Sequence, residues 1–549
     1  MAYGYRLDTA AETIEVTGVD VLVAGVRLDG LGGARRLLDR FDYATAHVGG
    51  LRYELADSLH VLRAAAARFD TRGARLRLDS VRLRPRLPGF DPDAESEPGP
   101  TVPAGVAWAV TFDADDVEVA GVDLRALLQQ QALRARLLSL DTATVEVFRG
   151  AAASRTGGDG GGARAGQTVA IDSVDLAGVA LAYRANGPRA HLEVPRAEFL
   201  LTDLALGEAR APGRERLFDF AEGRISLRDG LRYRPGADVE IGFAKADLDV
   251  VAGTASVTDL RYGPPLNAEG EPTGLLTVLA DGVEATGVDY ARLLWEGTLS
   301  TAEVDVAGLI VGAQTDVRGR TGERSPQDLL LVRLQRVPLP LEIDELAVTD
   351  ADVRYRRRTD DSDETLRWGE TDATFYHVGT SAAYAKTHPR AEVDIATRFE
   401  AMLPVDVRVT WPNAAGAPYE LEAETGALDD LTRINHFLEP MAAIRVEGGR
   451  LERLAFSWTS DERRGRGRLQ ATYNGFRVNL LDESGDDKDV ISLLANVAAV
   501  REESDGRSAR VDVERPANQG MFGHWWAIIR DGLRQVALND LGERVAPGD

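Results

Sequence analysis

The chain contains no cysteine, and only three of its 549 residues are lysine. Without thiols it can form no disulfide or zinc thiolate site, and no cysteine can act as a nucleophile. The positive charge therefore comes almost entirely from arginine. There are 64 basic and 88 acidic residues, which gives a net charge of -24. This charge argues against a nucleic-acid groove or an anionic membrane surface as the main partner.

Long apolar runs are missing as well. No run reaches the roughly 18 residues of a transmembrane helix, and residues 1–8 lack the basic and apolar segments of a signal peptide. The sequence therefore predicts a soluble chain with no anchor of its own. A strand-like pattern begins almost at the first residue, which is typical of a piece cut from a longer protein.

Catalytic and metal-binding motifs are also lacking. The seven histidines are scattered, with no pair at metal-ligand spacing, and the acidic segments 360–364 and 482–489 lack the pattern of an EF-hand loop. The glycine-rich segment 157–162 lacks the Gly-Lys-Ser/Thr ending of a phosphate-binding loop. No serine-nucleophile motif occurs either. We expect no catalytic residue, no metal site and no cofactor.

What the chain does contain is an internal repeat. The first copy has Val117-Glu118, Gly121-Val122-Asp123 and Leu127-Leu128; the second has Val283-Glu284, Gly287-Val288-Asp289 and Leu293-Leu294 at the same spacing. In both copies the alternation predicts a strand, the glycine a sharp bend, and the aspartate the N-cap of a short helix before another strand. Such self-similarity predicts a fold built by repetition.

Periodicity outside the repeat predicts further elements. Apolar residues between Leu51 and Phe69 follow a helical spacing, and helices are also predicted over residues 325–334 and 428–438. From Val393 to Trp411 the odd positions are almost all apolar and many even positions are charged. This stretch is either one very long strand or a hairpin that keeps its facing, and both give a sheet with one apolar face.

These patterns predict a mostly β, elongated and repetitive fold with short helices. Four segments are expected: an N-terminal β/α segment over residues 1–110, repeated strand-helix-strand modules over 111–324, a long-stranded sheet over 325–518, and a C-terminal amphipathic helix and tail over 519–549.

Two parts of the chain resemble the AsmA-like family of bacterial envelope proteins, which includes the TamB-type proteins, and in particular its Bacteroidota-like forms. One part is the repeated module followed by Leu341-Glu342-Ile343-Asp344-Glu345-Leu346. The other runs from Gly426-Ala427-Leu428 to Ser492-Leu493-Leu494-Ala495-Asn496. The resemblance implies a curved antiparallel β-sheet groove, open like a folded taco, whose apolar face carries lipid acyl chains across the periplasm. Members of the family usually begin with an inner-membrane anchor, which this chain lacks.

The resemblance turns the apolar positions of the alternating stretch into candidate lipid-groove residues. They are Val393, Ile395, Phe399, Leu403, Val405, Val407, Val409 and Trp411. The expected partners are a phospholipid or another lipid, and a membrane or membrane protein at either end of the chain, with no nucleic acid.

The segment from Gln519 to Leu538 is the most aromatic part of the chain and reads as an amphipathic helix. Its candidate docking residues are Met521, Phe522, Trp525, Trp526, Ile529 and Leu533. Two interpretations remain open. The helix docks to a membrane or partner through its tryptophans, or it caps the open end of the sheet and the tryptophans belong to the core.

The function expected from the sequence is therefore non-enzymatic lipid binding in the cell envelope, serving lipid transport or outer-membrane biogenesis. One alternative is a passive envelope scaffold whose apolar sheet face is closed by the chain's own helices. A less favoured one is a polysaccharide-active enzyme with a parallel β-helix.

The acid excess predicts a salt dependence of stability. Repulsion among acidic side chains opposes the compact state, and added salt screens it as the Debye length falls from roughly 10 Å at 0.1 M to about 3 Å at 1 M. Thermal melts in this range of salt concentration should show a rising Tm. A Tm that stays flat would contradict the argument.

Overall fold

The computed structural model describes residues 4–8, 13–26, 42–54, 60–86, 108–124, 126, 132–149, 169–185, 190–206, 218–234, 239–264, 276–316, 339–358, 363–413, 418–442, 444–461, 463–480, 501–503, 507–515 and 521–545. The chain divides into two compact units, Met1–Asp259 and Leu260–Asp549. This boundary falls inside the segment 111–324 that the sequence suggested as one part. Each unit is described by itself.

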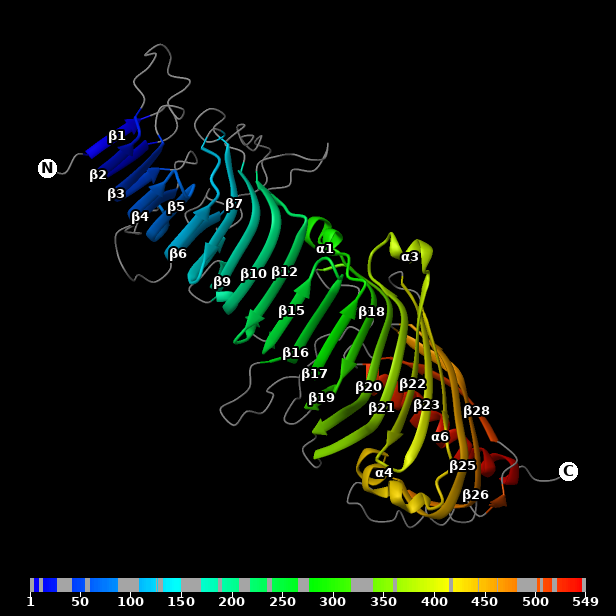
Figure 1. Cartoon of the computed structure of the whole chain (residues 1–549). Helices are drawn as coiled ribbons and strands as arrows, with labels where there is room; N and C mark the ends of the chain where they lie inside the picture. The colour runs from blue at the N-terminus through cyan, green and yellow to red at the C-terminus, as the bar shows by residue number, and fades with distance from the viewer. Residues whose placement is uncertain are drawn as a thin grey trace, which may run out of the picture. The chain divides into compact units, whose positions relative to one another are not determined.

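Unit 1 is built from strands (Figure 1). They are β1 (Gly4–Asp8), β2 (Thr13–Ala24), β3 (Tyr43–Glu54), β4 (His60–Asp70), β5 (Arg75–Pro85), β6 (Trp108–Ala120), β7 (Leu133–Leu140), β8 (Ala143–Arg149), β9 (Val169–Ala185), β10 (Ala190–Leu206), β11 (Phe218–Asp219), β12 (Glu222–Arg228), β13 (Leu231–Tyr233), β14 (Glu240–Phe243), β15 (Lys245–Asp249) and β16 (Thr254–Gly263), which ends in unit 2. None of the helices whose bounds are described belongs to this unit.

Unit 2 combines long strands with short helices and one long helix. Its elements are β17 (Leu276–Thr286), α1 (Tyr290–Glu296), β18 (Leu299–Ala307), β19 (Ile310–Asp316), β20 (Leu341–Arg358), β21 (Asp363–Gly379), α3 (Tyr384–Thr387), β22 (Arg390–Phe399), β23 (Leu403–Pro412), β24 (Tyr419–Thr425), the 3-10 helix η3 (Leu431–Ile434), α4 (Asn435–Ala442), β25 (Ile444–Ser460), β26 (Arg464–Leu480), β27 (Arg501–Glu503), β28 (Arg507–Glu514) and α6 (Met521–Val545). The mostly β fold with helices is confirmed.

The internal repeat is confirmed as a repeat of topology. In each copy a long strand, β6 or β17, pairs antiparallel with two short strands in line with each other, β7 and β8 or β18 and β19. The two short strands then pair in parallel with the next long strand, β9 or β20. The sheet is therefore mixed, whereas a purely antiparallel sheet was expected.

The glycine and aspartate of the repeat have the roles that the sequence predicts. Gly121 and Gly287 adopt left-handed φ values of 71° and 67° where the long strand ends. The Asp289 side chain accepts a hydrogen bond from the backbone N–H of Arg292 at the start of α1, and Asp123 accepts one from Ala126 in the first copy. Residues 127 and 128, predicted to lie on the first short helix, are outside the described residues.

The helix predicted between Leu51 and Phe69 is wrong, because residues 51–54 belong to β3 and residues 60–69 to β4, while 55–59 lie outside the described residues. Register with β3 and β5 places Leu62, Ala64, Ala67 and Phe69 on one face, with an irregular step between Ala64 and Ala67. Spacings of two, three and two imitate a helical period, and hydrogen bonding to two neighbouring strands outweighs the helix propensity of alanine and leucine.

The other predicted elements have mixed outcomes. The stretch from Val393 to Trp411 is a hairpin, β22 and β23, in which Val393 faces Val409 and Ile395 faces Val407. The helix expected over 428–438 begins later, as η3 and α4, and continues past Pro440 to Ala442. The helix expected over 325–334 lies outside the described residues.

The bend at Gly287 yields a prediction about stability. Replacement of Gly287 by alanine should lower the free energy of unfolding by about 1–2 kcal/mol, since a left-handed φ is costly for an L-residue. The added Cβ would also lie 2.7 Å from the Ala302 Cβ. Gly282→Ala in the same strand is the control, because its Cβ would meet nothing within 4 Å. Equal urea midpoints for the two variants would contradict this account.

Candidate functional site: an apolar face of the sheet

Unit 1 carries rows of apolar side chains that run across its strands, from each residue to its partner in the neighbouring strand. One row, which we call row 2, consists of Val19, Val48, Ala67, Leu78, Val117, Leu140, Leu176, Phe199, Ile225, Leu248 and Ala255. Row 3 consists of Val16, Leu51, Ala64, Val81, Ala114, Ala143, Val179, Ala197, Leu227, Ala246 and Val257. Neither row is interrupted by a polar residue from β2 to β16.

Two further rows flank this pair. Row 1 consists of Val21, Ala46, Phe69, Leu76, Val119, Leu138, Val174 and Leu201. Row 4 consists of Ile14, Tyr53, Leu62, Leu83, Phe112, Val145, Leu181 and Val194. We call the surface formed by rows 1 to 4 the apolar face of unit 1.

The four rows lie on one face although rows 2 and 3 are three positions apart in several strands. A residue with a left-handed φ stands between them in β2, β5 and β9: Gly18, Ser80 and Gly178. In β9 this residue lies opposite a shift of register in β10, and such a bulge restores the facing that an odd step would otherwise reverse. Members of rows 2, 3 and 4 pack into one cluster, and row 1 joins it through Leu138.

The opposite face of unit 1 carries charge. Arg77 bonds Asp116, Arg84 bonds Asp113, and Arg184 bonds Glu146, each across neighbouring strands. On β12 and β15, Arg228 and further hydrogen bonds hold the pKa of Asp247 well below its ordinary range. The sheet therefore separates an apolar face from a face of ion pairs.

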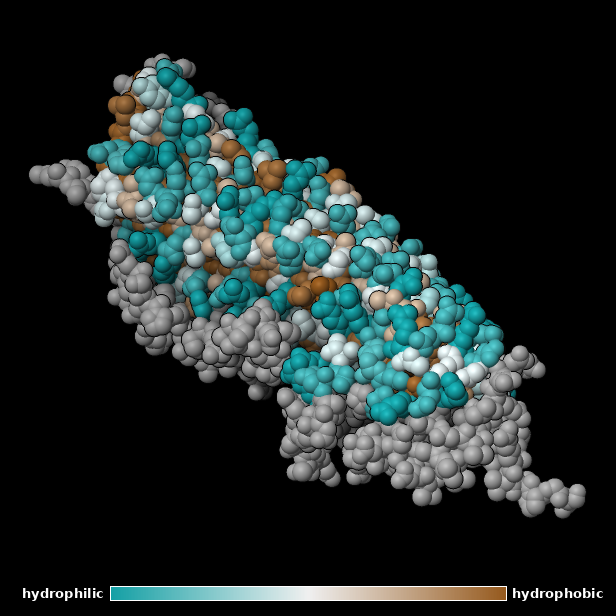
Figure 2. All heavy atoms as spheres, turned by 90° about the horizontal axis from the view of Figure 1, so that it is seen from below, coloured by the Kyte–Doolittle hydropathy of each residue, from teal (hydrophilic) through white to brown (hydrophobic). Residues whose placement is uncertain are grey.

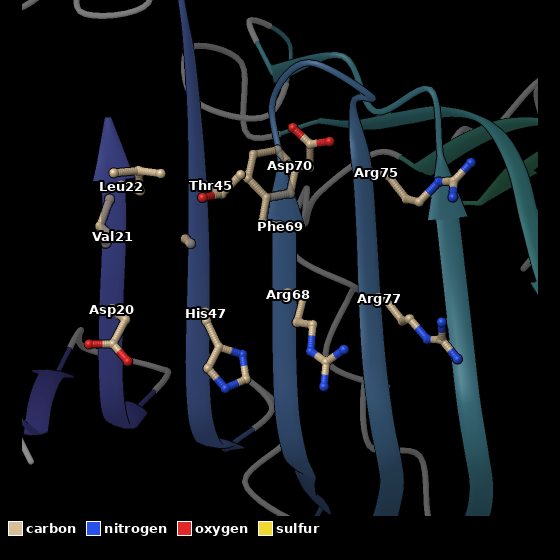
Figure 3. A pocket seen from close by; sticks show the side chains of 11 residues that line it. Asp20, Val21, Leu22, Thr45, His47, Arg68, Phe69, Asp70, Arg75 and Arg77 are labelled. Atoms are coloured by element: carbon tan, nitrogen blue, oxygen red, sulfur yellow. The ribbon is translucent and has the colours of Figure 1, made fainter. Parts of the chain in front are cut away.

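A hollow on β2 to β5 is lined by charged residues of that second face and also by Val21, Ala46 and Phe69 of row 1. Figure 3 shows Asp20, His47, Arg68 and Arg77 side by side on four neighbouring strands. Arg68 pairs with Asp79 at 3.6 Å, and Arg77 pairs with Asp116. These contacts have the pattern of cross-strand pairs that stabilise a sheet rather than of an acid–base couple.

Unit 2 repeats the apolar rows on its own sheet. Row A consists of Val283, Val306, Val348, Ala373, Ile395, Val407, Ala423, Phe456, Leu469 and Ala509. Row B consists of Ala285, Val304, Leu346, Phe375, Val393, Val409, Leu421, Trp458, Gly467 and Val511. The glycine in row B leaves room for Trp458, whose Cβ would lie 2.4 Å from an added Cβ.

Helix α6 covers the end of these rows formed by the last strands. It packs on β26 and β28, and Figure 1 shows it beside the bent C-terminal strands. Gly465 and Gly532 permit the close approach, since a Cβ on Gly465 would lie 2.4 Å from Ile528. Trp525 donates a hydrogen bond of 2.7 Å to the Tyr419 hydroxyl and meets Trp458 edge-on.

The packing of α6 buries one titratable side chain completely. His524 is 0% exposed, its Nε2 lies 3.1 Å from the Ser460 hydroxyl, and its Nδ1 has no hydrogen-bond partner. Burial lowers the pKa of His524 to about 4, and the positive charge of Arg515 adds to this effect while Asp461 opposes it. The docked helix therefore favours neutral His524.

The candidate groove residues of the hairpin all lie on one face, but they are divided between two clusters. Val393, Val409 and Trp411 are buried in the cluster that includes α6, with Ile395 and Val407 packed against it. Leu403, Phe399 and Val405 belong to a second cluster, together with Phe437 and Leu438 of α4. At this end of unit 2 the chain's own helices occupy much of the apolar face.

The candidate docking residues of the C-terminal helix also pack inside the chain's own apolar clusters. Met521, Trp525, Ile529 and Leu533 pack against the sheet cluster, and Trp526 packs against the cluster of α4. The Phe522 side chain lies outside the described residues. This is the packing expected of a cap.

Sequence reasoning missed one pair of histidines that the fold brings together. His377 and His388 stack with ring centroids 4.5 Å apart, and Asn413 donates hydrogen bonds to both backbone carbonyls. Both histidines are close to strand ends that meet only through the pairing of β21 with β22, so no local spacing could reveal them. In the described part of the chain no three acidic or histidine side chains gather as metal ligands would.

No protein-family model matches the chain, and a comparison with curated proteins finds no relative. Among the described helices, none combines the length and the apolar character that crossing a membrane requires.

Buried His524 predicts that docking of α6 weakens in acid. When the helix is released, His524 regains an ordinary pKa of 6.5, whereas the docked value is about 4. Docking is therefore strongest above pH 6.5 and weakens as the pH falls from 6.5 toward 4. Fluorescence of Trp525 and Trp526 followed from pH 7.5 to 4 should report this release.

The matched control is His524→Asn, which keeps a hydrogen-bonding side chain but cannot titrate in this range. In this variant the tryptophan fluorescence should no longer show release of α6 between pH 6.5 and 4. If the variant and the parent protein release the helix at the same pH, His524 is not the responsible group.

Proposed function

We propose that this chain binds the acyl chains of lipids along the apolar face of its sheet and serves lipid transport in the bacterial envelope. The observation that carries the proposal is the uninterrupted course of rows 2 and 3 from β2 to β16. A core that only stabilises a fold needs apolar residues where another element covers them. A path for acyl chains needs them at every strand.

The dimensions of the apolar face support a lipid as its occupant. In β4 the face extends from Leu62 in row 4 to Phe69 in row 1, seven residues apart. At about 3.3 Å per residue this is about 23 Å, which exceeds the roughly 15 Å of acyl layer in one leaflet of a bilayer. Lipid tails can thus lie on the face with their headgroups at its border.

The charged face of the sheet also supports the proposal of lipid binding. Ion pairs such as Arg77 with Asp116 keep that face compatible with water, while a lipid on the apolar face would remove hydrocarbon from water on both partners at about 25 cal/mol per Å². We propose that the sheet curves around this face as a groove. Binding of this kind requires no catalytic group, and we propose a non-enzymatic protein.

The setting within the cell rests on the resemblance alone. The AsmA-like and TamB-type pattern supports a periplasmic chain that belongs to a form anchored in the inner membrane, with a membrane or membrane protein at either end. Four candidate groove residues of the hairpin remain half-buried, and we propose them as part of the lipid path in unit 2: Ile395, Phe399, Val405 and Val407.

The second candidate function is a passive envelope scaffold, which the packing of α6 and α4 favours. Where the chain's own helices fill the apolar face, as around Trp458 and Phe437, no lipid is needed to cover it. Native mass spectrometry of protein purified without detergent separates the candidates, because a conduit should retain phospholipid and a scaffold should give the mass of the chain alone.

Two adjacent leucines on β10 offer a matched test of the apolar face. Leu201 belongs to row 1, whereas Leu200 is 45% exposed and lies between Asp175 and Arg224 on the charged face. Leu201→Asp should abolish retention of lipid, because a carboxylate among acyl chains costs several kcal/mol without a partner. Leu200→Asp should leave it unchanged, since water and Arg224 meet the new charge.

Lipid retention is measured by native mass spectrometry and by transfer of a fluorescent phospholipid between vesicles. Thermal melts of both variants identify any loss that comes from unfolding, and Leu201→Gln provides a milder variant if the aspartate unfolds unit 1. Equal lipid retention in Leu201→Asp and Leu200→Asp would overturn the proposed face.

A further inference from the structure

In the part of the chain that the structure describes, the N-terminal edge of unit 1 is covered along only half of its length. Strand β1 pairs with Thr13 to Thr17 of β2, and no described strand lies beside the remaining half, from Gly18 to Ala24. Elsewhere in unit 1 a long strand is matched along its length by two strands in line, as β6 is by β7 and β8. At β2 the second place of such a pair is open in the described structure.

This half-edge has the properties of a strand that binds another strand. Val21 and Leu22 are each 60% exposed, Val23 is 41% exposed and Val26 is 55% exposed. These residues are four of the ten exposed large apolar side chains in the described part of the chain, and Figure 2 shows brown side chains gathered at the end where the N-terminal strands lie. Proteins usually protect an edge with charges, proline or a bulge, but from Val19 to Ala24 the single charged residue is Asp20.

A second edge strand stands at the far end of the described chain. Strand β28 is registered against β26, and no other strand is registered against it in the described part. Ala509 and Val511 are buried ends of rows A and B, while Arg510 between them is exposed. In the described structure no ion pair involving Asp20 or Arg510 is present.

We infer that β28 of one copy of the chain pairs with the Gly18–Ala24 half of β2 in a second copy, so that copies join head to tail. A register that sets Val19 and Val21 beside Ala509 and Val511 continues the apolar rows from one copy into the next. The same register places Asp20 opposite Arg510, whether the two strands run parallel or antiparallel. Opposite charges at facing positions stabilise a strand pair.

This interface differs from a symmetric dimer. Because β2 and β28 are different surfaces, each added copy leaves one of each open, and association continues into longer assemblies. The inference goes beyond the proposed function: it would extend the sheet from one copy into the next, while α6 covers the apolar face at the β28 end, and association itself needs no lipid. An experiment that finds no self-association would therefore leave the proposed lipid binding untouched, and an experiment that finds no lipid retention would leave the proposed self-association untouched.

The absence of cysteine makes the interface directly testable by disulfide cross-linking. The variant that carries both Asp20→Cys and Arg510→Cys should form a ladder of covalent oligomers on mild oxidation, whereas each single variant should not. The control combines Asp20→Cys with Arg468→Cys, because Arg468 is exposed and faces Arg510 from β26, one strand inside the edge. A ladder of equal yield from the control would overturn the assignment of the edge.

Charge exchange tests the pairing in the otherwise unmodified chain. In lipid-free sedimentation experiments, Asp20→Arg or Arg510→Asp should each raise the dissociation constant of self-association by about tenfold, and the double exchange should restore it. Val21→Lys should weaken self-association more than either single charge exchange does. Thermal melts of this variant check that unit 1 stays folded. A chain that remains monomeric at every concentration, or a double exchange without rescue, would overturn the inference whatever the lipid experiments show.

Discussion

Cross-strand register is the constraint on which the rest of this structure depends. Each apolar row exists only because a residue in one strand stands beside its partner in the next, from Val19 through Leu78 and Leu176 to Ala255 in row 2. A slip of one residue in any strand would move its apolar side chains to the charged face. The shift of register between β9 and β10 at Gly178 meets the same constraint, because a bulge absorbs an extra residue without reversing the facing.

The two faces contribute unequally to this register. An exposed ion pair such as Arg408 with Asp394 contributes about 0.2–1 kcal/mol, whereas complete burial of a leucine or valine contributes about 1.5–3 kcal/mol. The apolar rows therefore supply most of the stability. The charged partners, by opposing wrong pairings, favour one register over its neighbours.

An apolar face of this extent has to be covered, and in the described part of unit 2 helices α6 and α4 cover part of it. In unit 2, α6 lies on the last strands through the close contacts of Gly465 and Gly532 and buries His524 without a partner for its Nδ1. A buried unpaired nitrogen costs about 1–3 kcal/mol, so the docked helix is held less tightly than its apolar contacts alone would allow. In unit 1 no helix of described bounds takes this position, and we propose that a lipid does.

The sequence by itself determined the β class, the repeat and the two-sided strands, because alternation, glycine bends and aspartate caps are local properties of the chain. Gly287, Asp289 and the stretch from Val393 to Val409 could be interpreted without knowledge of any neighbour. The tertiary structure alone decided which strands pair, that four of the described pairings are parallel, and that Trp525 faces Tyr419. It also decided that residues 60–69 are a strand, since the three-residue step from Ala64 to Ala67 gives the strand the spacing of a helix and only its neighbours distinguish the two.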